Sequence, residues 1–360
     1  KDDPDEDKDG IEDAKEGTAK VTSFGAAPAV VIGATGRDIA IGALPATASG
    51  FGIIIDGSIT GTGVYAGVDG NGMVIGGRGG DVSVAGGIAI NGSVTAASRD
   101  SNATALRFGA GATTPELRNA GTISASGGAS DTTQATALSI DAGANLPYVR
   151  NSGKITATAL KDASSAVAIV DRSGTLQLVE NSGSISASGA KAGTGRNIAI
   201  DISSVSAGAV VRQTVVGSGV TAPSITGDIL FGGGADRLEL LDGTAAGDVS
   251  FGAGVDRFVM SGDARFSGKA SFGGQADELI LSGTSAFAGT ADFAGGTGTL
   301  TLGDNALFKG RLAGSENVSV TVDGGTLDLG VPTTLSTLAV GANGVIVGTL
   351  SKDPAAGTAI

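Results

Sequence analysis

The residues best suited to chemistry lie in the first 18, where nine side chains are acidic and three are basic. In DEDKDGIEDAKE, residues 5–16, carboxylates alternate along the chain, a Gly follows the third of them, and a Glu closes the segment. This order is typical of a calcium loop, which places carboxylates at alternating positions, Gly at the sharp turn and a backbone carbonyl directly after it. The predicted calcium ligands are the carboxylates of Asp5, Asp7, Asp9, Asp13 and Glu16 and the backbone carbonyl of Ile11.

Calcium would also order this segment. Without metal the five carboxylates repel one another, so we expect the loop to fold only on binding Ca²⁺, with an affinity on the order of 10⁻⁴ to 10⁻³ M. The stretch resembles the loops of dockerins and thrombospondin type 3 repeats more than a complete EF-hand, because only four residues precede it and GTAKVTSF after it has the pattern of a strand. The alternative is a solvated run of charge with no bound ion.

The remaining composition excludes several kinds of active site. The chain has no His, Cys or Trp, which excludes Ser-His-Asp machinery, thiolate nucleophiles and disulfides. The densest acidic positions outside the first 18 residues are Asp236, Asp256 and Asp277, one per repeat. They would serve either as a catalytic carboxylate column or as caps for backbone N–H groups of Gly-rich turns, and we expect the caps. The sequence therefore predicts no enzyme.

Two arrays of repeats occupy most of the chain. The first combines an Asn-Gly turn with a short alternating strand, as in NAGTISAS, NSGKITAT and NSGSISAS, and a second strand recurs in step with it. The second array repeats units such as FGGGADRLELLDG every 20 or 21 residues. Its leading residues are Phe231, Phe251, Phe272 and Phe293; the first array is marked by Asn119, Asn151 and Asn181 in the turn and by Leu106, Leu138, Ile169 and Ile200 in the second strand.

Short strands with a fixed period predict an all-β solenoid, because one repeat cannot bury a core alone and stacked repeats can. Parallel strands in register place like residues on like. We therefore expect the Asn residues to form a ladder of side-chain amides at one corner and the Phe residues to form an aromatic ladder. At ~4.8 Å per coil, some 12 to 15 coils would give a rod of roughly 60 to 70 Å.

The turn-strand units and the FGGGADRLEL units resemble the passenger regions of bacterial autotransporters (type V secretion) over about residues 20 to 350. The resemblance implies a right-handed parallel β-helix exported through an outer-membrane barrel, and the stretch from Gly344 to Ile360 resembles the segment before such a barrel. We expect an acidic calcium segment (1–18), a β-helix with repeats of ~30 residues (19–225), its continuation with repeats of ~20 residues (226–350), and a tail (351–360) leading to an absent barrel.

The leading functional hypothesis is a secreted or cell-surface structural or adhesive protein that self-associates into fibres or a surface layer, or contacts surface carbohydrate or protein. The net charge of −13 and the lack of a basic patch argue against nucleic acid. No apolar run of about 18 residues exists, so we expect no membrane insertion. Because the chain starts at Lys1, we expect a processed product. The alternatives are an extracellular polysaccharide-acting lyase or hydrolase on the same scaffold, and an inert stalk.

Overall fold

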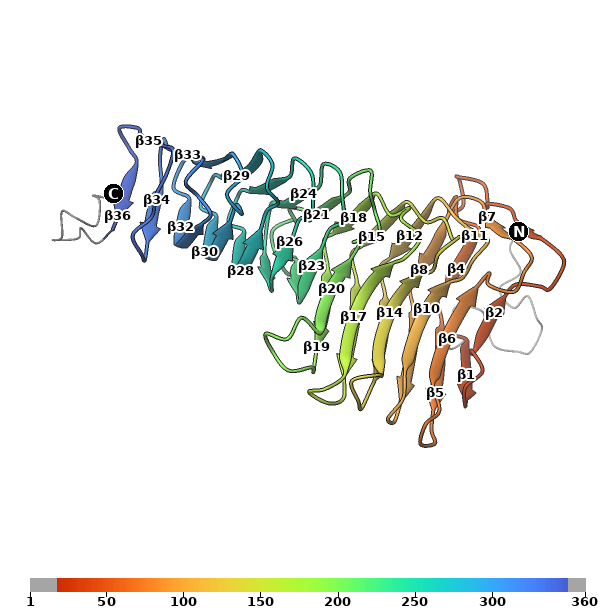
Figure 1. Cartoon of the computed structure of the whole chain (residues 1–360). Coiled ribbons are helices and arrows are strands. Elements are labelled where there is room, and N and C mark those ends of the chain that lie inside the picture. The colour runs from red at the N-terminus through yellow and green to blue at the C-terminus, as the bar shows by residue number, and fades with distance from the viewer. Residues whose placement is uncertain (1–17, 349–360) are drawn as a thin grey trace.

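The computed structural model describes residues 18–348, so the predicted calcium loop at residues 5–16 lies outside the described residues. Within this range the chain is all β and has no helix, and hence none that could cross a membrane. The pairings between its strands are parallel. Figure 1 shows the strands stacked along one axis, with the first strand, β1, and the last, β36, at opposite ends of the rod. The predicted all-β, parallel architecture is confirmed, and the arrangement is consistent with a β-helix or solenoid.

Three long ladders of strands follow the axis, and a short sheet of β3 (Ile39–Ile41), β7 (Val82–Val84) and β11 (Ala112–Thr113) accompanies them near the N-terminal end. Ladder 1 contains β1 (Lys20–Phe24), β5 (Ser58–Gly63), β9 (Ser93–Ser98), β13 (Thr122–Gly127), β16 (Lys154–Ala159), β19 (Ser184–Ser188), β22 (Ser224–Thr226), β25 (Thr244–Ala246), β28 (Arg265–Ser271), β30 (Ala286–Asp292), β32 (Leu307–Ala313), β34 (Thr326–Leu329) and β36 (Val345–Val347). Ladder 2 contains β2 (Val30–Ile32), β6 (Gly70–Ile75), β10 (Ala103–Phe108), β14 (Gln134–Ile140), β17 (Ser165–Asp171), β20 (Asn197–Asp201), β23 (Asp228–Leu230) and β26 (Val249–Ser250). Ladder 3 contains β4 (Ile53–Ile55), β8 (Ile88–Ile90), β12 (Glu116–Asn119), β15 (Tyr148–Asn151), β18 (Leu178–Asn181), β21 (Val210–Gln213), β24 (Arg237–Leu240), β27 (Arg257–Met260), β29 (Asp277–Leu281), β31 (Gly298–Leu302), β33 (Val318–Val322) and β35 (Thr337–Val340).

One coil passes through the three ladders in turn. In the coil that starts at Tyr148, a tight turn leads from β15 into β16, and a loop then leads into β17. Each strand pairs with its copy one coil away, so that Leu106 lies opposite Leu138, Leu138 opposite Ile169, and Ile169 opposite Ile200. The predicted repeat markers therefore stack in register.

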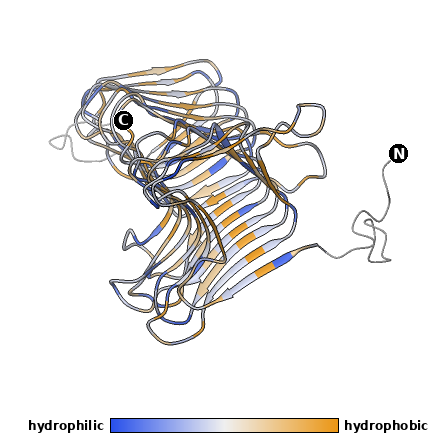
Figure 2. Cartoon of the chain, turned by 90° about the vertical axis from the view of Figure 1, so that its right-hand side faces the viewer, coloured by the Kyte–Doolittle hydropathy of each residue, from blue (hydrophilic) through white to orange (hydrophobic). Residues whose placement is uncertain are grey.

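The core forms because alternate side chains of each strand point inward. In β16, KITATA, Ile155 and Ala157 are buried while Thr156 and Thr158 are half-exposed. Figure 2 shows hydrophobic positions repeating in rows from coil to coil. Because every coil contributes to the same rows, the buried apolar cluster is continuous from Ile55 to Leu329.

The coils differ in width along the rod. Register-paired residues are 32 apart at Asn119 and Asn151 but 21 apart at Gly268 and Gly289. In the wider coils a loop connects ladders 1 and 2, whereas in the narrower coils a single glycine does so. Figure 1 shows the narrower cross-section toward the C-terminal end. The corner glycines have φ between 114° and 152°, a region that side-chain-bearing residues rarely adopt; they are Gly227, Gly247, Gly268, Gly289 and Gly310.

The predicted asparagine ladder is present at the turn between ladders 3 and 1. The Asn119 side-chain amide donates to Asn151 Oδ1 at 2.7 Å, and the Asn151 amide donates to Asn181 Oδ1 at 2.8 Å. All three side chains are buried. The ladder continues to Gln213, whose Oε1 accepts from Asn181 at 3.3 Å. Paired amides thus satisfy most polar groups of the ladder, which would otherwise be costly to bury. Asn119 Oδ1, at the first step, has no partner among the described residues.

The predicted aromatic ladder is also present. The rings of neighbouring Phe231, Phe251, Phe272 and Phe293 stack with centroids 5.2, 4.8 and 4.8 Å apart and interplanar angles of 3°, 4° and 13°. A second column, which the sequence did not single out, pairs Phe287 with Phe308 at 4.9 Å. These columns fill the narrower coils, where fewer residues are available per turn.

Candidate functional site

The predicted calcium ligands cannot be placed, because residues 5–16 lie outside the described residues, and the calcium site stays a prediction. Elsewhere, in residues 18–348, no group of three or more His, Cys, Asp or Glu side chains is arranged to hold a metal ion. The described chain offers three other polar features: a buried carboxylate column, a groove on ladder 2 and a groove on ladder 3.

The column consists of Asp236, Asp256 and Asp277, all of them buried. Each carboxylate uses Oδ1 to accept a backbone N–H from the preceding coil: Ala209 to Asp236 at 2.7 Å, Asp236 to Asp256 at 2.8 Å, and Asp256 to Asp277 at 2.9 Å. The column ends at Gly298, which pairs with Asp277 in the next coil. The prediction that these residues cap backbone N–H groups is confirmed.

The electrostatics of the column follow from its burial. The Oδ2 atom of each carboxylate is buried and has no hydrogen-bond partner in the described part of the chain. Burial disfavours the charged form, and it raises the pKa of Asp236 to about 7 and that of Asp256 to about 6. The pKa of Asp277 is also raised by burial, against the lowering effect of the Asp256 N–H. Asp236 and Asp256 are therefore buried groups whose charge state changes near neutral pH.

A polar groove of about 370 Å³ runs across β6, β10, β14 and β17 on ladder 2. At one end of it, Arg107 Nε pairs with Asp141 Oδ2 at 2.5 Å, and Arg172 donates to Ser139 Oγ at 3.0 Å while lying 4.0 Å from Asp141. The Asp141 carboxylate is thus held between two guanidinium groups.

The ladder 2 groove has a second carboxylate, Asp69, at its other end. Asp69 precedes β6 and bonds the Ser101 hydroxyl at 2.5 Å, whereas Asp141 follows β14. The two carboxylates thus lie at opposite ends of these strands, and the length of such a strand separates them by roughly 20 Å. Glycosidase carboxylates lie about 5 to 9.5 Å apart, so these two cannot act as such a pair.

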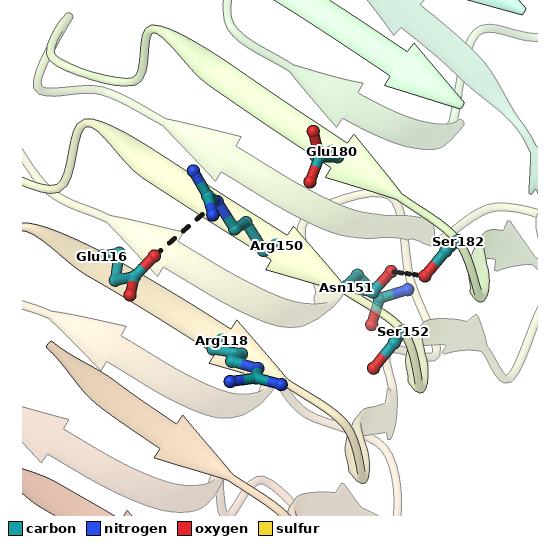
Figure 3. Close-up of a pocket in the computed structure, with 7 residues that line it drawn as sticks. All are labelled: Glu116, Arg118, Arg150, Asn151, Ser152, Glu180 and Ser182. Carbon is teal, nitrogen blue, oxygen red and sulfur yellow. Dashed lines mark hydrogen bonds and ion pairs between the residues drawn. The ribbon is translucent and has the colours of Figure 1, made fainter. Parts of the chain in front are cut away.

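A second groove, of about 380 Å³, lies on the outer face of ladder 3 over β12, β15 and β18 (Figure 3). Arg118 lies opposite Arg150, and Arg150 lies opposite Glu180, on successive strands. Arg150 pairs with Glu116 at 3.7 Å. Arg118 has no acidic partner in the described part of the chain. The groove is lined by Glu116, Arg118, Arg150, Asn151, Ser152, Glu180 and Ser182.

Beyond the groove the charges on ladder 3 are paired. Arg212 contacts Glu180 at 3.9 Å and also pairs with Glu239, and Arg257 pairs with Glu278 at 3.0 Å. Among the ladder 3 arginines at this face, Arg118 is therefore the one whose charge is not balanced by a described neighbour.

The sequence indicates this charged face by a pattern that lies outside the repeat motifs described above. The residue before each ladder amide is charged: Arg118 before Asn119, Arg150 before Asn151, and Glu180 before Asn181. Because the Asn points into the core, the residue before it must point outward. The buried ladder thus fixes a column of charges on the opposite face.

With the fold and these grooves described, comparison with protein-family models, with curated protein sequences and with solved structures found no match.

Proposed function

We propose that the chain is a secreted or cell-surface structural protein, the β-helical passenger of an autotransporter, which self-associates or adheres through its outer faces. The observation that carries the proposal is the unbroken stacking: in-register ladders and a continuous core from Ile55 to Leu329 make a rod whose outer faces are polar. In such a rod each repeat contacts its neighbours, and outward side chains recur at regular steps along the axis. We infer right-handed winding, since about 98% of crossovers between parallel strands have that hand.

Exposed apolar side chains at the two ends of the described range support self-association. The terminal strands β35 and β36 leave Val340, Val345 and Val347 between 46% and 49% exposed, and at the other end Phe24 on β1 is 74% exposed. An exposed strand edge with apolar side chains is a template for pairing with another chain.

We propose in addition that Ca²⁺ orders residues 5–16 and so ties this segment to its own rod or to a neighbour. Electron microscopy and limited proteolysis with about 10 mM Ca²⁺, and with chelator, test this; that concentration lies above the ~10⁻⁴ to 10⁻³ M expected for such loops. We expect larger assemblies and a protected N-terminus with Ca²⁺, and the double variant Asp5→Ala with Glu16→Ala should mimic chelation.

The matched control is Asp3→Ala with Glu12→Ala, which removes the same charge from positions that are not predicted ligands. This variant should behave as the native chain. If native protein gives the same particles and the same cleavage with Ca²⁺ and with chelator, the calcium role is wrong. If it forms no assemblies and coats no surface under either condition, the structural role is wrong.

One observation favours the second candidate, a polysaccharide-acting enzyme: the Arg107–Asp141–Arg172 cluster lies in an open polar groove. Depolymerisation of a panel of acidic and neutral polysaccharides, followed by viscosity and product absorbance, tests it. Activity that is lost in Asp141→Asn would replace the structural proposal with the enzymatic one.

A further inference from the structure

The unbalanced arginine in the ladder 3 groove points to a ligand. Arg118 and Arg150 lie directly opposite each other on neighbouring strands, ~4.8 Å apart, an arrangement in which like charges repel. Figure 3 shows the Arg150 guanidinium turned toward Glu116 and away from Arg118. The guanidinium N–H donors of Arg118 therefore line the groove and have no carboxylate partner among the described residues. A planar anion that binds two of these donors would neutralise it.

The other lining residues narrow the chemistry of the ligand. Glu116 and Glu180 offer acceptors, and the Ser152 and Ser182 hydroxyls make only long bonds, of 3.4 and 3.5 Å, to backbone carbonyls. Carboxylate acceptors beside a free guanidinium suit a molecule that carries both hydroxyl donors and a carboxylate. An anion without hydroxyl donors would place its charge beside the two glutamates and offer them no hydrogen bond.

An aromatic side chain lies at the same face. Tyr148 is on β15 two residues before Arg150, so both point outward, and it lies opposite Glu116 on β12. Tyr148 as a whole residue is 39% exposed. An exposed tyrosine presents an apolar face with a polar tip, which fits the C–H face and the hydroxyl edge of a sugar ring.

We propose that the face of ladder 3 around Arg118, Tyr148 and Arg150 binds uronic-acid saccharides. Arg118 holds the sugar carboxylate, Glu116 and Glu180 accept hydrogen bonds from hydroxyls, and Tyr148 packs on a ring. The inference rests on the proposed adhesive function and names its ligand class.

The test is a ligand-observed NMR titration of the full chain with tetragalacturonate at low ionic strength. Chelator is present throughout, so that no cation bridges the saccharide to the acidic N-terminal segment. We expect a Kd on the order of 1 mM or below, weakened about tenfold or more in Arg118→Gln and in Tyr148→Ala. Arg257→Gln removes another exposed but ion-paired arginine from the same ladder and should bind as the native chain does.

Two further ligands separate the saccharide from charge alone. The carboxyl-reduced, neutral tetrasaccharide should bind at least about tenfold more weakly, because the Arg118 contact is lost. Tetraglutamate, with equal charge and no sugar rings, should also bind more weakly. Equal binding of either ligand, no binding of tetragalacturonate, or an unchanged Kd in Arg118→Gln in a variant with native melting behaviour, overturns the proposal. Assembly measured separately by microscopy reports on the structural role, so a failure here is distinguishable from a failure there.

Discussion

At the scale of single residues, the buried carboxylates show how a solenoid uses Asp where a globular core would avoid it. Asp236, Asp256 and Asp277 each bond one N–H of the coil before, which satisfies donors that a Gly-rich turn leaves inside the rod. The cost is a second oxygen per residue without a partner. That cost is lowest when the carboxyl carries a proton, since a neutral group is cheaper to bury.

The column therefore predicts that stability falls as the pH rises. The folded pKa is about 7 for Asp236 and about 6 for Asp256, against an unfolded value of 3.8. Between these values the folded chain binds more protons than the unfolded chain, so the stabilisation is complete below pH ~4 and is lost up to pH ~7. We expect thermal melting by circular dichroism to occur at a lower temperature at pH 8 than at pH 4.

Substitution at one position of the column isolates this effect. Asp256→Asn keeps an acceptor for the Asp236 N–H and stays neutral, so its melting temperature should decline less between pH 4 and pH 8. Asp263→Asn removes an exposed carboxylate and should leave the decline unchanged. A melting temperature of the native chain that rises over this range would contradict the burial argument.

Residue-scale features were predictable to the extent that they repeat. Asn119, Asn151 and Asn181 recur with an Asn-Gly turn, and the ladder follows from stacking. Asn91 shows the limit: its motif looks alike, but Asn119 pairs with Ile90, and the Asn91 amide instead bonds Asp56 at 2.7 Å at the surface. The turn has the same length in both coils, since Ile90 pairs with Asn119 and Ser93 pairs with Thr122, so Asn91 lies in the turn one position beyond the ladder. Sequence similarity alone did not reveal this.

At the scale of elements, the corner glycines explain the two repeat lengths. Gly268, Gly289 and Gly310 lie in the middle of seven-residue strands that serve both ladders 1 and 2. An added Cβ at Gly289 would lie 1.9 Å from the Gly268 carbonyl oxygen. The close approach between coils and the positive φ both require glycine here. The sequence indicates the shorter period. It does not indicate that a glycine corner stands in place of the loop between ladders 1 and 2.

Gly289→Ala tests the corner. The clash is with backbone, which cannot move without disturbing the next coil, and we expect a loss of at least about 2 kcal/mol in the free energy of unfolding. Gly274→Ala is the matched control, because a Cβ there meets nothing within 4 Å, and it should change stability by less than about 0.5 kcal/mol. Denaturant unfolding of both variants measures the difference; equal losses would show that the corner has no special requirement.

At the scale of the whole molecule, each coil contacts mainly its two neighbours, as in other repeat proteins. Strand β17 has partners on both sides, β14 and β20, whereas within residues 18–348 β35 and β36 pair only with β33 and β34. Stability should therefore vary along the axis, being lowest where a coil has one neighbour.

Hydrogen exchange with mass spectrometry tests this gradient. We expect amides of β35 and β36 to exchange on the order of a thousandfold or more faster than those of β14 and β17, which are flanked by coils on both sides. Peptides from the interior strands, measured in the same experiment, serve as the internal reference. Uniform protection along residues 18–348 would show that the rod opens as a single cooperative unit.

The overall architecture was the most predictable level, because a fixed period constrains every coil at once. The charge pattern of ladder 3 was the least predictable. Arg118 and Glu116 belong to no motif, and their relation to Arg150 arises only when strands 32 residues apart are placed side by side.

The register of the asparagine ladder also determines how the gene could lose one repeat without disturbing the turn. Asn119 and Asn151 occupy equivalent places, so the gene segment between them encodes one complete coil. A recombination event that deletes residues 120–151 would join Asn119 to Ser152 and recreate an Asn-Ser-Gly turn. The shortened protein would keep both ends and lose ~4.8 Å of length. The length of this molecule can therefore change by whole coils, while the strands at both ends of the described range keep their sequence.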